Sequence, residues 1–592
     1  MKKFQFLEKY VPTRVTRAWE ALGGWVVGPD PPRPYQIRPF FPMIQVAPIR
    51  LLDRYCPKKK DKITLLIATY VVWFILFVVV LHKSAFAEDI PGYGSPTRVT
   101  CHARHWDGPG NECGVNGRDC SPFDNATFAF RCPASCEKAE VLEPYAVGGQ
   151  IVNYRPLVIG GPKELDKGVQ SNLYRGDSFI CPAAIHAGFS TKRSGGCGVI
   201  ALIGEQNEFP STKANGIESI GFDSYFPLSY SFVDGTAAQC PDLRWPLFSV
   251  SLTFTILISL FTTDPAVFFY SIFVSVFMHV ALASDPPSLT DYYTVISLTL
   301  GRFLPSMFIA YVMFRYPIKF QLTGLTAQFE KTVLWLGACW VGAFNNYTFD
   351  RIPISRLTPH DLKQQPGAIP ALVIIVLSLL AIALGQAWCF RVEGRMPRYL
   401  KLYAVFVLGI LIMVAIPKMS LRIHHYILAL LLLPGTALQT RPSLIYQGLL
   451  IGLFINGIAR WGFDSILQTP DELRGGAQLG SLLPVLLPEF PKINLNLDLA
   501  IPANITFAWA APPIEEGYDG VSVLVNDVER FNRVDDGKKD TREFAWERHE
   551  EGWPEYFRFA YLTGKRSRGD YTKAGTWDGN GTWIMMEPGP SK

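Results

Sequence analysis

The sequence predicts a multi-domain membrane protein, with an α-helical transmembrane bundle of about nine spans, a luminal α+β domain and a C-terminal β-sandwich-like domain. Apolar residues make up 49% of the 592 residues and charged residues only 18%, which is more typical of membrane proteins than of soluble ones. Eight of the eleven cysteines fall between Cys101 and Cys240, as in a disulfide-bonded module. Residues 500–592 contain short β-branched and aromatic stretches between Gly, Asp and Asn turns, the pattern of a small β-sandwich.

Changes in composition divide the chain into six predicted segments. These are a cytoplasmic tail at 1–62, a transmembrane anchor at 63–82, a cysteine-rich domain at 95–240, an eight-helix transmembrane region at 245–462, a connector at 463–499 and the β-sandwich-like domain at 500–592. The tail is rich in proline and holds 13 Lys and Arg against 5 Asp and Glu. Such a tail either attracts anionic lipid or simply orients the first span.

The first predicted span, Ile63–Leu81, contains no charge and is long enough to cross a bilayer, which takes about 20 residues. Ala85-Phe86-Ala87 after it has the pattern of a signal-peptidase site. A preceding region of 62 residues and an apolar core of 19 exceed those of a signal peptide, however, so we expect an uncleaved anchor. The lysines before it keep the N-terminus cytoplasmic and place residues 88–244 in an oxidising luminal or extracellular compartment.

Further apolar segments predict eight more spans, which place the C-terminus in the lumen. They are Trp245–Thr263, Ala266–Ala283, Tyr292–Phe314, Thr332–Tyr347, Ile369–Phe390, Tyr399–Ile416, Ile423–Leu438 and Ser443–Gly462. The spans that begin at Thr332 and Ile423 are short, and losing either would invert everything after it. This topology puts all four glycosylation sequons, Asn125, Asn346, Asn504 and Asn580, on the luminal side.

Tyr174–Gly188, "YRGDSFICPAAIHAG", predicts one short apolar helix within the cysteine-rich segment. Pro182 suits a first helical turn, the alanines favour helix, and Gly188 is a natural C-terminal stop. A helix of this length is not stable alone, so the rest of the segment must enclose it.

The surrounding motifs resemble those of the LCCL domain, a disulfide-bonded extracellular module. They are "FRCPASC" at 130–136, "YAVGGQIVNY" at 145–154, the helix itself and "STKRSGGCGVIALI" at 190–203, so that the resemblance covers about Val99–Phe232. The resemblance implies a central helix cradled by β-strands, with disulfides Cys101–Cys132 and Cys136–Cys181. Cys113–Cys120 and Cys197–Cys240 are the bridges predicted for the remaining cysteines. The whole arrangement is similar to multi-spanning LCCL proteins of fungi.

Candidate binding residues occur in both regions. His186 on the short helix could bind a ligand, although a packed histidine bonded to the backbone explains it as well. Arg193 lies in a Gly-rich turn that could bind an anion through backbone N–H groups, or could simply be a hairpin. Arg302, Arg460 and Asp464 are ionisable groups within or beside spans, and Arg460 could pair with Asp464 four residues later. These three either line a substrate cavity or hold helices together.

His279, His424 and Asp291 form a possible metal site near the luminal ends of the spans. A His/Asp set with an open position could hold zinc and hydrolyse a substrate. No H-x-x-x-H or H-E-x-x-H spacing occurs, and placement at the membrane interface explains these residues equally well.

The function predicted is recognition of a luminal glycan, lipid or protein by the LCCL domain, rather than a defined reaction. The alternatives are a membrane-embedded metal-dependent hydrolase and a transporter of a small or lipidic substrate. We expect membrane lipids as partners, no required cofactor and no nucleic acid. The expected location is a membrane of the secretory pathway, whether endoplasmic reticulum, vacuole or plasma membrane.

Overall fold

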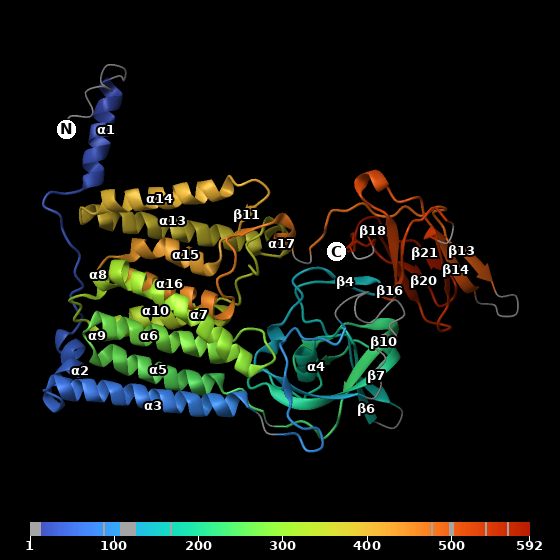
Figure 1. Ribbon diagram of the computed structural model, residues 1–592, viewed down its shortest axis with the longest axis horizontal. Coiled ribbons are helices and arrows are strands. Elements are labelled where there is room, and N and C mark those ends of the chain that lie inside the picture. Colours follow the sequence, from blue (N-terminus) through green and yellow to red (C-terminus); the bar gives the residue numbers. More distant parts are fainter. Residues whose placement is uncertain are drawn as a thin grey trace. The chain divides into compact units, whose positions relative to one another are not determined.

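The computed structural model describes residues 13–86, 89–106, 126–165, 169–238, 240–474, 477–495, 502–538, 541–564 and 567–591. The chain forms two compact units. The helical unit comprises residues 1–83 and 243–473, and the second unit comprises 84–242 and 474–592 (Figure 1). Each unit is assembled from two distant parts of the chain, because the LCCL-like segment is inserted between α3, Lys59–Ala85, and the later helices of the helical unit.

Seven helices of the helical unit, among the described residues, are long and apolar enough to cross a membrane. They are α3 Lys59–Ala85, α5 Arg244–Phe261, α6 Pro265–His279 with its extension to Ser284, α7 Tyr292–Met313 with its extension to Leu322, α13 Ala368–Val392, α14 Met396–Val414 and α16 Arg441–Arg460. Each coincides with a predicted span.

The two spans predicted to be short are helical but do not reach this length. One is a π-helix, Lys331–Leu336, continued by α10 Gly337–Ala343. The other is α15 His425–Leu432, continued by a 3-10 turn, Leu433–Thr436. Each of the nine predicted spans therefore falls on a helical segment, and seven of these are long enough, among the described residues, to be candidate spans.

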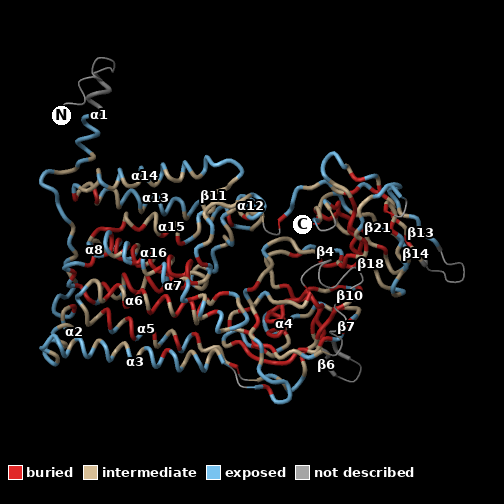
Figure 2. Tube along the Cα trace, viewed as in Figure 1, coloured by how far each residue is buried: buried red, intermediate tan, exposed pale blue. Residues whose placement is uncertain are grey.

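The helical unit has a buried centre and an apolar exterior. In the most apolar stretch of α16, 72% of the residues are buried, against 6% in α3 and none in α14. The pale blue outer helices of Figure 2 thus surround a red interior. Many exposed side chains on α3, α13 and α14 are large and apolar, among them Phe74, Leu377 and Leu408. An apolar surface of this extent suits contact with lipid rather than water.

A six-stranded sheet encloses the short helix α4, Ile180–His186, in the second unit. The strand order is β1-β2-β7-β10-β6-β5. The strands are β1 Thr97–Arg98, β2 Thr127–Cys132, β5 Gly160–Leu165, β6 Val169–Arg175, β7 Gly196–Phe209 and β10 Phe222–Phe232. A separate hairpin, β3 Tyr145–Val147 and β4 Gln150–Val152, lies beside the sheet. Every residue of α4 is buried, which confirms the predicted helix enclosed by strands.

The disulfides around α4 correct the pairing that the family resemblance implied. The bonds are Cys101–Cys136 and Cys132–Cys181. The cause is strand register: β1 runs parallel to β2, so that the position opposite Cys132 falls at Val99 rather than at Cys101. Cys101 lies two residues further on and reaches Cys136, which leaves Cys132 to anchor the helix through Cys181.

The predicted third bridge, Cys197–Cys240, is present and joins the start of β7 to the segment that leads into α5. Cys113 and Cys120 lie outside the described residues. Three described cysteines are free: Cys56, Cys339 and Cys389. All three belong to the helical unit, whereas the six cysteines of the described disulfides belong to the second unit.

The C-terminal module contains two sheets with a common aromatic core. One sheet has the order β13-β14-β17, and the other has β16-β15-β18-β20-β21. Their strands are β13 Lys492–Leu495, β14 Pro502–Ala508, β15 Gly520–Val525, β16 Val528–Val534, β17 Glu543–Glu547, β18 Glu555–Thr563, β20 Gly575–Trp577 and β21 Trp583–Ile584. Phe507 of β14 contacts Phe557 and Phe559 of β18 with ring centroids 4.9 and 5.1 Å apart. The strand-rich C-terminal domain expected from the sequence is therefore present.

Candidate ligand-binding site

The C-terminal module docks onto the LCCL-like domain through the tip of the β15–β16 hairpin. Asn526 and Asp527 form this tip with φ of 52° and 65°, the left-handed geometry of a tight hairpin turn that favours Asn, Asp and Gly. The Asp527 carboxylate accepts from the Gly148 backbone N–H at 2.8 Å and from Arg175 at 2.9 Å. It also accepts a hydrogen bond from Arg558. One carboxylate thus joins the two modules through residues that are 352 and 379 positions away from it in sequence.

The two arginines around Asp527 have almost no access to solvent. The side chains of Arg175 and Arg558 are 0% and 1% exposed. Arg175 also forms a bidentate pair with Asp177, at 2.8 and 2.7 Å, and its guanidinium lies 4.6 Å from the ring centroid of Phe222. Two carboxylates therefore compensate two buried cations, which is the condition under which buried charge is tolerated.

A second buried contact between the modules centres on Glu555. Its carboxylate accepts from the Tyr225 hydroxyl at 3.1 Å and from the Trp546 indole N–H at 3.0 Å. Burial raises the pKa of the Glu555 carboxyl. At the rim, Asn207 donates to Glu550 at 2.7 Å. The interface is therefore extensive and polar, and the LCCL-like domain and the C-terminal module form one unit.

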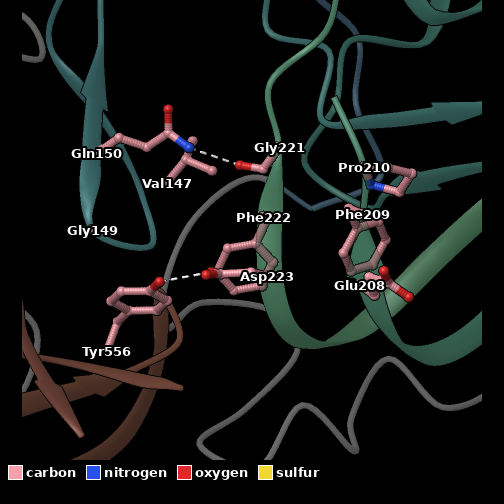
Figure 3. Close-up of a pocket in the computed structure, with 10 residues that line it drawn as sticks. All are labelled: Val147, Gly149, Gln150, Glu208, Phe209, Pro210, Gly221, Phe222, Asp223 and Tyr556. Carbon is pink, nitrogen blue, oxygen red and sulfur yellow. Dashed lines mark hydrogen bonds between the residues drawn. The ribbon is translucent and has the colours of Figure 1, made fainter. Parts of the chain in front are cut away.

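A cavity of about 490 Å³ opens beside this junction (Figure 3). Three parts of the LCCL-like domain and one residue of the C-terminal module line it. The lining residues are Val147, Gly149, Gln150, Glu208, Phe209, Pro210, Gly221, Phe222, Asp223 and Tyr556. Its volume is within the range of small-molecule sites, roughly 300–1,000 Å³.

Tyr556 completes the cavity from the C-terminal module. Its hydroxyl donates to Asp223 Oδ1 at 2.6 Å, and its backbone N–H donates to Asn526 at 3.0 Å. On the other wall, Gln150 Nε2 donates to the Gly221 carbonyl at 2.7 Å (Figure 3). The hairpin that binds the two modules together thus also positions the tyrosine that closes the cavity.

The cavity combines hydrogen-bonding groups with aromatic faces. Asp223 is exposed, and its second carboxylate oxygen has no partner among the described residues. Glu208 adds a second carboxylate and adopts a left-handed backbone with φ of 55°. Phe222 and Tyr556 present rings 6.1 Å apart between their centroids. Such a lining suits a ligand with several hydroxyl groups and an apolar face, and disfavours an anion.

His186 and Arg193 were the residues of this unit that the sequence singled out for binding. The His186 ring is buried, with Nδ1 2.8 Å from the Tyr174 hydroxyl and Nε2 3.2 Å from the Thr212 carbonyl oxygen. Both ring nitrogens thus have partners within the protein, the arrangement of a packed histidine. Arg193 is exposed in the turn before β7. Neither residue lines the cavity.

His105 is a titratable group of the LCCL-like domain that sequence reasoning missed. Its ring contacts Tyr230 with centroids 5.4 Å apart, and its Nε2 is buried without a hydrogen-bond partner in the described part of the chain. Burial lowers the pKa of His105 to about 4. Because its folded pKa lies below its unfolded value, this histidine stabilises the fold less as the pH falls from about 6.5 to about 4.

We expect acidification to destabilise the wild type more than a His105→Phe variant. By pH 4 the wild type should lose about 3 kcal/mol of its free energy of unfolding through His105, because each unit of pKa shift corresponds to roughly 1.4 kcal/mol. Thermal midpoints of the two proteins, measured between pH 7 and pH 4, test this. The variant should show the shallower decline, and parallel declines would contradict the assignment.

The structure corrects the pairing predicted for Arg460. Arg460 pairs with Asp285 at 2.7 Å rather than with Asp464. The helix α16 ends at Arg460, so the four-residue spacing does not keep Asp464 on the same helical face. Asp285 also accepts from Asn346 at 3.0 Å. The polar residues of this region thus connect α16 to the end of the α6 segment and to the segment after α10.

Arg302 of α7 also links helices. Its guanidinium donates to the carbonyls of Ala459, Arg460 and Trp461, at 2.9, 2.7 and 3.2 Å, and so satisfies the C-terminal end of α16. The structure therefore gives Arg302 and Arg460 partners on or beside other helices. This arrangement fits the interpretation that these residues hold helices together rather than line a substrate cavity.

The three candidate metal ligands have separate surroundings. Asp291 caps α7, accepting from the Thr294 N–H at 2.7 Å. His424 lies before α15, with Nε2 3.2 Å from the Ser465 carbonyl oxygen. His279 is buried among aromatic rings, including that of Trp340 with centroids 5.4 Å apart. Within either unit, as far as its residues are described, no three His, Cys or carboxylate ligand atoms converge.

The predicted glycosylation sites have different surroundings. Asn125 lies outside the described residues. The Asn346 amide donates to Asp285, and Asn504 accepts from Asn494 at 2.7 Å within the β13–β14 pair. Asn580 is exposed in a turn, where its side-chain oxygen accepts from the Thr582 N–H at 2.9 Å. Of the described sequons, the one at Asn580 is the most accessible.

Sequence comparisons place these features in a known class. Residues 99–232 match the LCCL domain family, so the protein combines an LCCL domain with a set of apolar helices long enough to be membrane spans. The chain belongs to the same family as a protein of Saccharomyces cerevisiae, "Uncharacterized protein YIL067C". The two are 34% identical over 588 residues, which cover 90% of this chain and 84% of the yeast protein. No solved structure shows significant similarity to the chain.

Proposed function

We propose that the protein is an integral membrane protein of the secretory pathway whose LCCL domain binds a neutral carbohydrate in the cavity completed by Tyr556. The observation that carries this proposal is the cavity itself, with exposed carboxylate and amide groups beside two aromatic rings. The disulfides of the second unit support a luminal or extracellular location. The basic tail supports a cytoplasmic N-terminus.

A carbohydrate fits the cavity better than the other two ligand classes considered from the sequence. Carboxylate oxygens such as those of Asp223 accept hydrogen bonds from pairs of sugar hydroxyls, and charge strengthens these bonds. The cavity lacks the continuous apolar lining that a lipid chain requires. A protein partner would require a broad contact surface of about 800 Å² on each partner. A cavity of about 490 Å³ suits a small ligand instead.

A screen of the full-length protein in detergent against neutral oligosaccharides tests this function. The Asp223→Asn substitution keeps an acceptor for Tyr556 but removes the charge. A hydrogen bond to a charged group contributes about 1.5–3 kcal/mol, so we expect Kd to rise at least about tenfold.

Asp234→Asn is the matched control, because Asp234 is an exposed aspartate of the same unit, just after β10, and does not line the cavity. Its Kd should equal that of the wild type. The proposal fails if no oligosaccharide binds saturably, or if the two substitutions weaken binding equally.

A further inference from the structure

A second cavity lies inside the helical unit, between the α13–α14 pair and α16. Its volume is about 360 Å³, and its walls come from the C-terminal half of α13, the N-terminal half of α14, the 3-10 turn at Leu433–Thr436 and the first half of α16. Small residues, including Ala383 of α13 and Gly435 of the turn, leave this space open. A Cβ added at Gly435 would lie 2.7 Å from the Tyr403 hydroxyl, so the glycine allows the tyrosine to reach the cavity wall.

In the described part of the chain no charged side chain lines this cavity, but several polar groups do. Gln386 accepts a hydrogen bond from Ser443 at 2.9 Å through Oε1, and its Nε2 has no partner among the described residues. The Tyr446 hydroxyl likewise has no described partner, and the Tyr403 hydroxyl donates a long bond of 3.4 Å to the Leu432 carbonyl. Donors are therefore available within an otherwise apolar space.

The guanidinium of Arg395, which contacts the lining residue Tyr399, does not contribute an uncompensated charge to the cavity. Arg395 donates to Glu393 at 2.8 Å, to the Ala437 carbonyl at 2.8 Å and to the Tyr399 hydroxyl at 2.8 Å. Its charge is compensated by Glu393, whose side chain is only 2% exposed. Among the described residues that line the cavity, none offers a cation to an anionic headgroup, whereas a single hydroxyl would find hydrogen-bonding partners.

We propose that this cavity binds a neutral amphipathic lipid, with its apolar body between α13 and α16 and its hydroxyl group at Gln386. Almost no residue in the apolar stretches of the outer helices of this wall, α13 and α14, is buried, so a lipid has direct access from a surrounding bilayer. The inference rests on the proposed membrane location but is independent of the carbohydrate cavity. Sterols and monoacylglycerols both combine an apolar body with a hydroxyl group. The experiment distinguishes them by using one photoreactive probe of each kind.

The test uses the full-length protein in lipid nanodiscs with two photoreactive probes, a diazirine sterol and a diazirine monoacylglycerol. Ala383→Phe fills the cavity and should reduce labelling by the bound probe about tenfold or more. Gln386→Leu removes the donor with little change in volume. Since a hydrogen bond contributes roughly 0.5–1.5 kcal/mol, this substitution should weaken labelling about two- to twelvefold.

Ala381→Phe is the matched control, because Ala381 is exposed on the same helix and lies about 200° around it from Ala383. Its labelling should remain within about twofold of the wild type. Labelled peptides should map to residues 379–403 or 432–450, and excess unlabelled lipid should compete. The proposal is overturned if neither probe is competed, if Ala383→Phe and Gln386→Leu label normally, or if Ala381→Phe loses labelling equally.

Discussion

Replacing Asp527 by alanine should destabilise the second unit by about 3–5 kcal/mol, the usual cost of removing one partner from a buried ion pair. The carboxylate is shared by Arg175 and Arg558, and the Gly148 N–H also donates to it. Asp177 would still compensate Arg175, but Arg558 would retain only neutral acceptors such as the Gly148 carbonyl. A guanidinium that is 1% exposed would thus be left without a counter-charge.

Hydrogen exchange of the full-length protein in detergent measures this effect and locates it. Exchange should accelerate at the β15–β16 hairpin and at the β3–β4 hairpin, because Asp527 joins the two. The thermal midpoint of the second unit should fall by several degrees, since about 1 kcal/mol corresponds to roughly 2–4 °C in a unit of this size.

Glu587→Ala provides the matched control for Asp527→Ala. Glu587 also pairs with a basic residue, Lys573 at 2.9 Å, but its side chain is 78% exposed. A solvent-exposed ion pair contributes little to stability, so exchange at both hairpins should stay at the wild-type level. Equal effects of the two substitutions would show that the modules do not depend on the buried network.

The same junction links stability to ligand binding. Asn526, beside Asp527, accepts the backbone N–H of Tyr556, and Tyr556 in turn holds Asp223 in the cavity. Loosening the hairpin tip should therefore weaken carbohydrate binding even though Asp527 does not line the cavity.

Local patterns in the sequence were sufficient to locate the elements of this fold. Apolar runs marked the helices, and the Pro182 to Gly188 pattern marked α4 within a residue or two. The pairing of Cys132 was wrong because it depends on strand register, which places Val99 rather than Cys101 beside it. Arg460 was paired wrongly because its helix ends before Asp464.

The candidate site itself could not be predicted from local patterns. Arg175 and Asp527 are separated by 352 positions, and only folding brings them together. The one local indication was the Asn526-Asp527 pair between two apolar strands, which predicts a tight turn but gives no information about what the turn contacts. Local patterns likewise contained no indication that the LCCL domain and the C-terminal module belong to one compact unit.

Replacing Gly452 by alanine should disrupt the centre of the helical unit. A Cβ at this position would lie 2.1 Å from the Cys339 carbonyl oxygen and 2.5 Å from the Ala343 backbone nitrogen. Both contacts are to backbone, so no side-chain rotation can relieve them. Gly448, one turn earlier, is equally close to the Trp335 carbonyl oxygen. The small-residue spacing in α16 is thus what lets α10 and its preceding π-helix approach closely.

Overpacking of this kind costs about 1–3 kcal/mol for a buried site, and helices in contact through their backbones have little freedom to separate. We therefore expect Gly452→Ala to lower the temperature at which the full-length protein loses its monodisperse peak in size-exclusion chromatography. The Gly448→Ala and Gly452→Ala double variant should show a larger loss, because both substitutions push the same pair of helices apart.

Gly385→Ala is the control, because this substitution is expected to maintain or raise, rather than lower, the heat resistance of the protein. Gly385 lies inside α13, and a Cβ added there would meet nothing within 4 Å. Alanine favours helix over glycine by about 1 kcal/mol, so this variant should be as heat-resistant as the wild type or more so. If Gly385→Ala and Gly452→Ala behave alike, the close approach of α10 and α16 does not determine the stability of the helical unit.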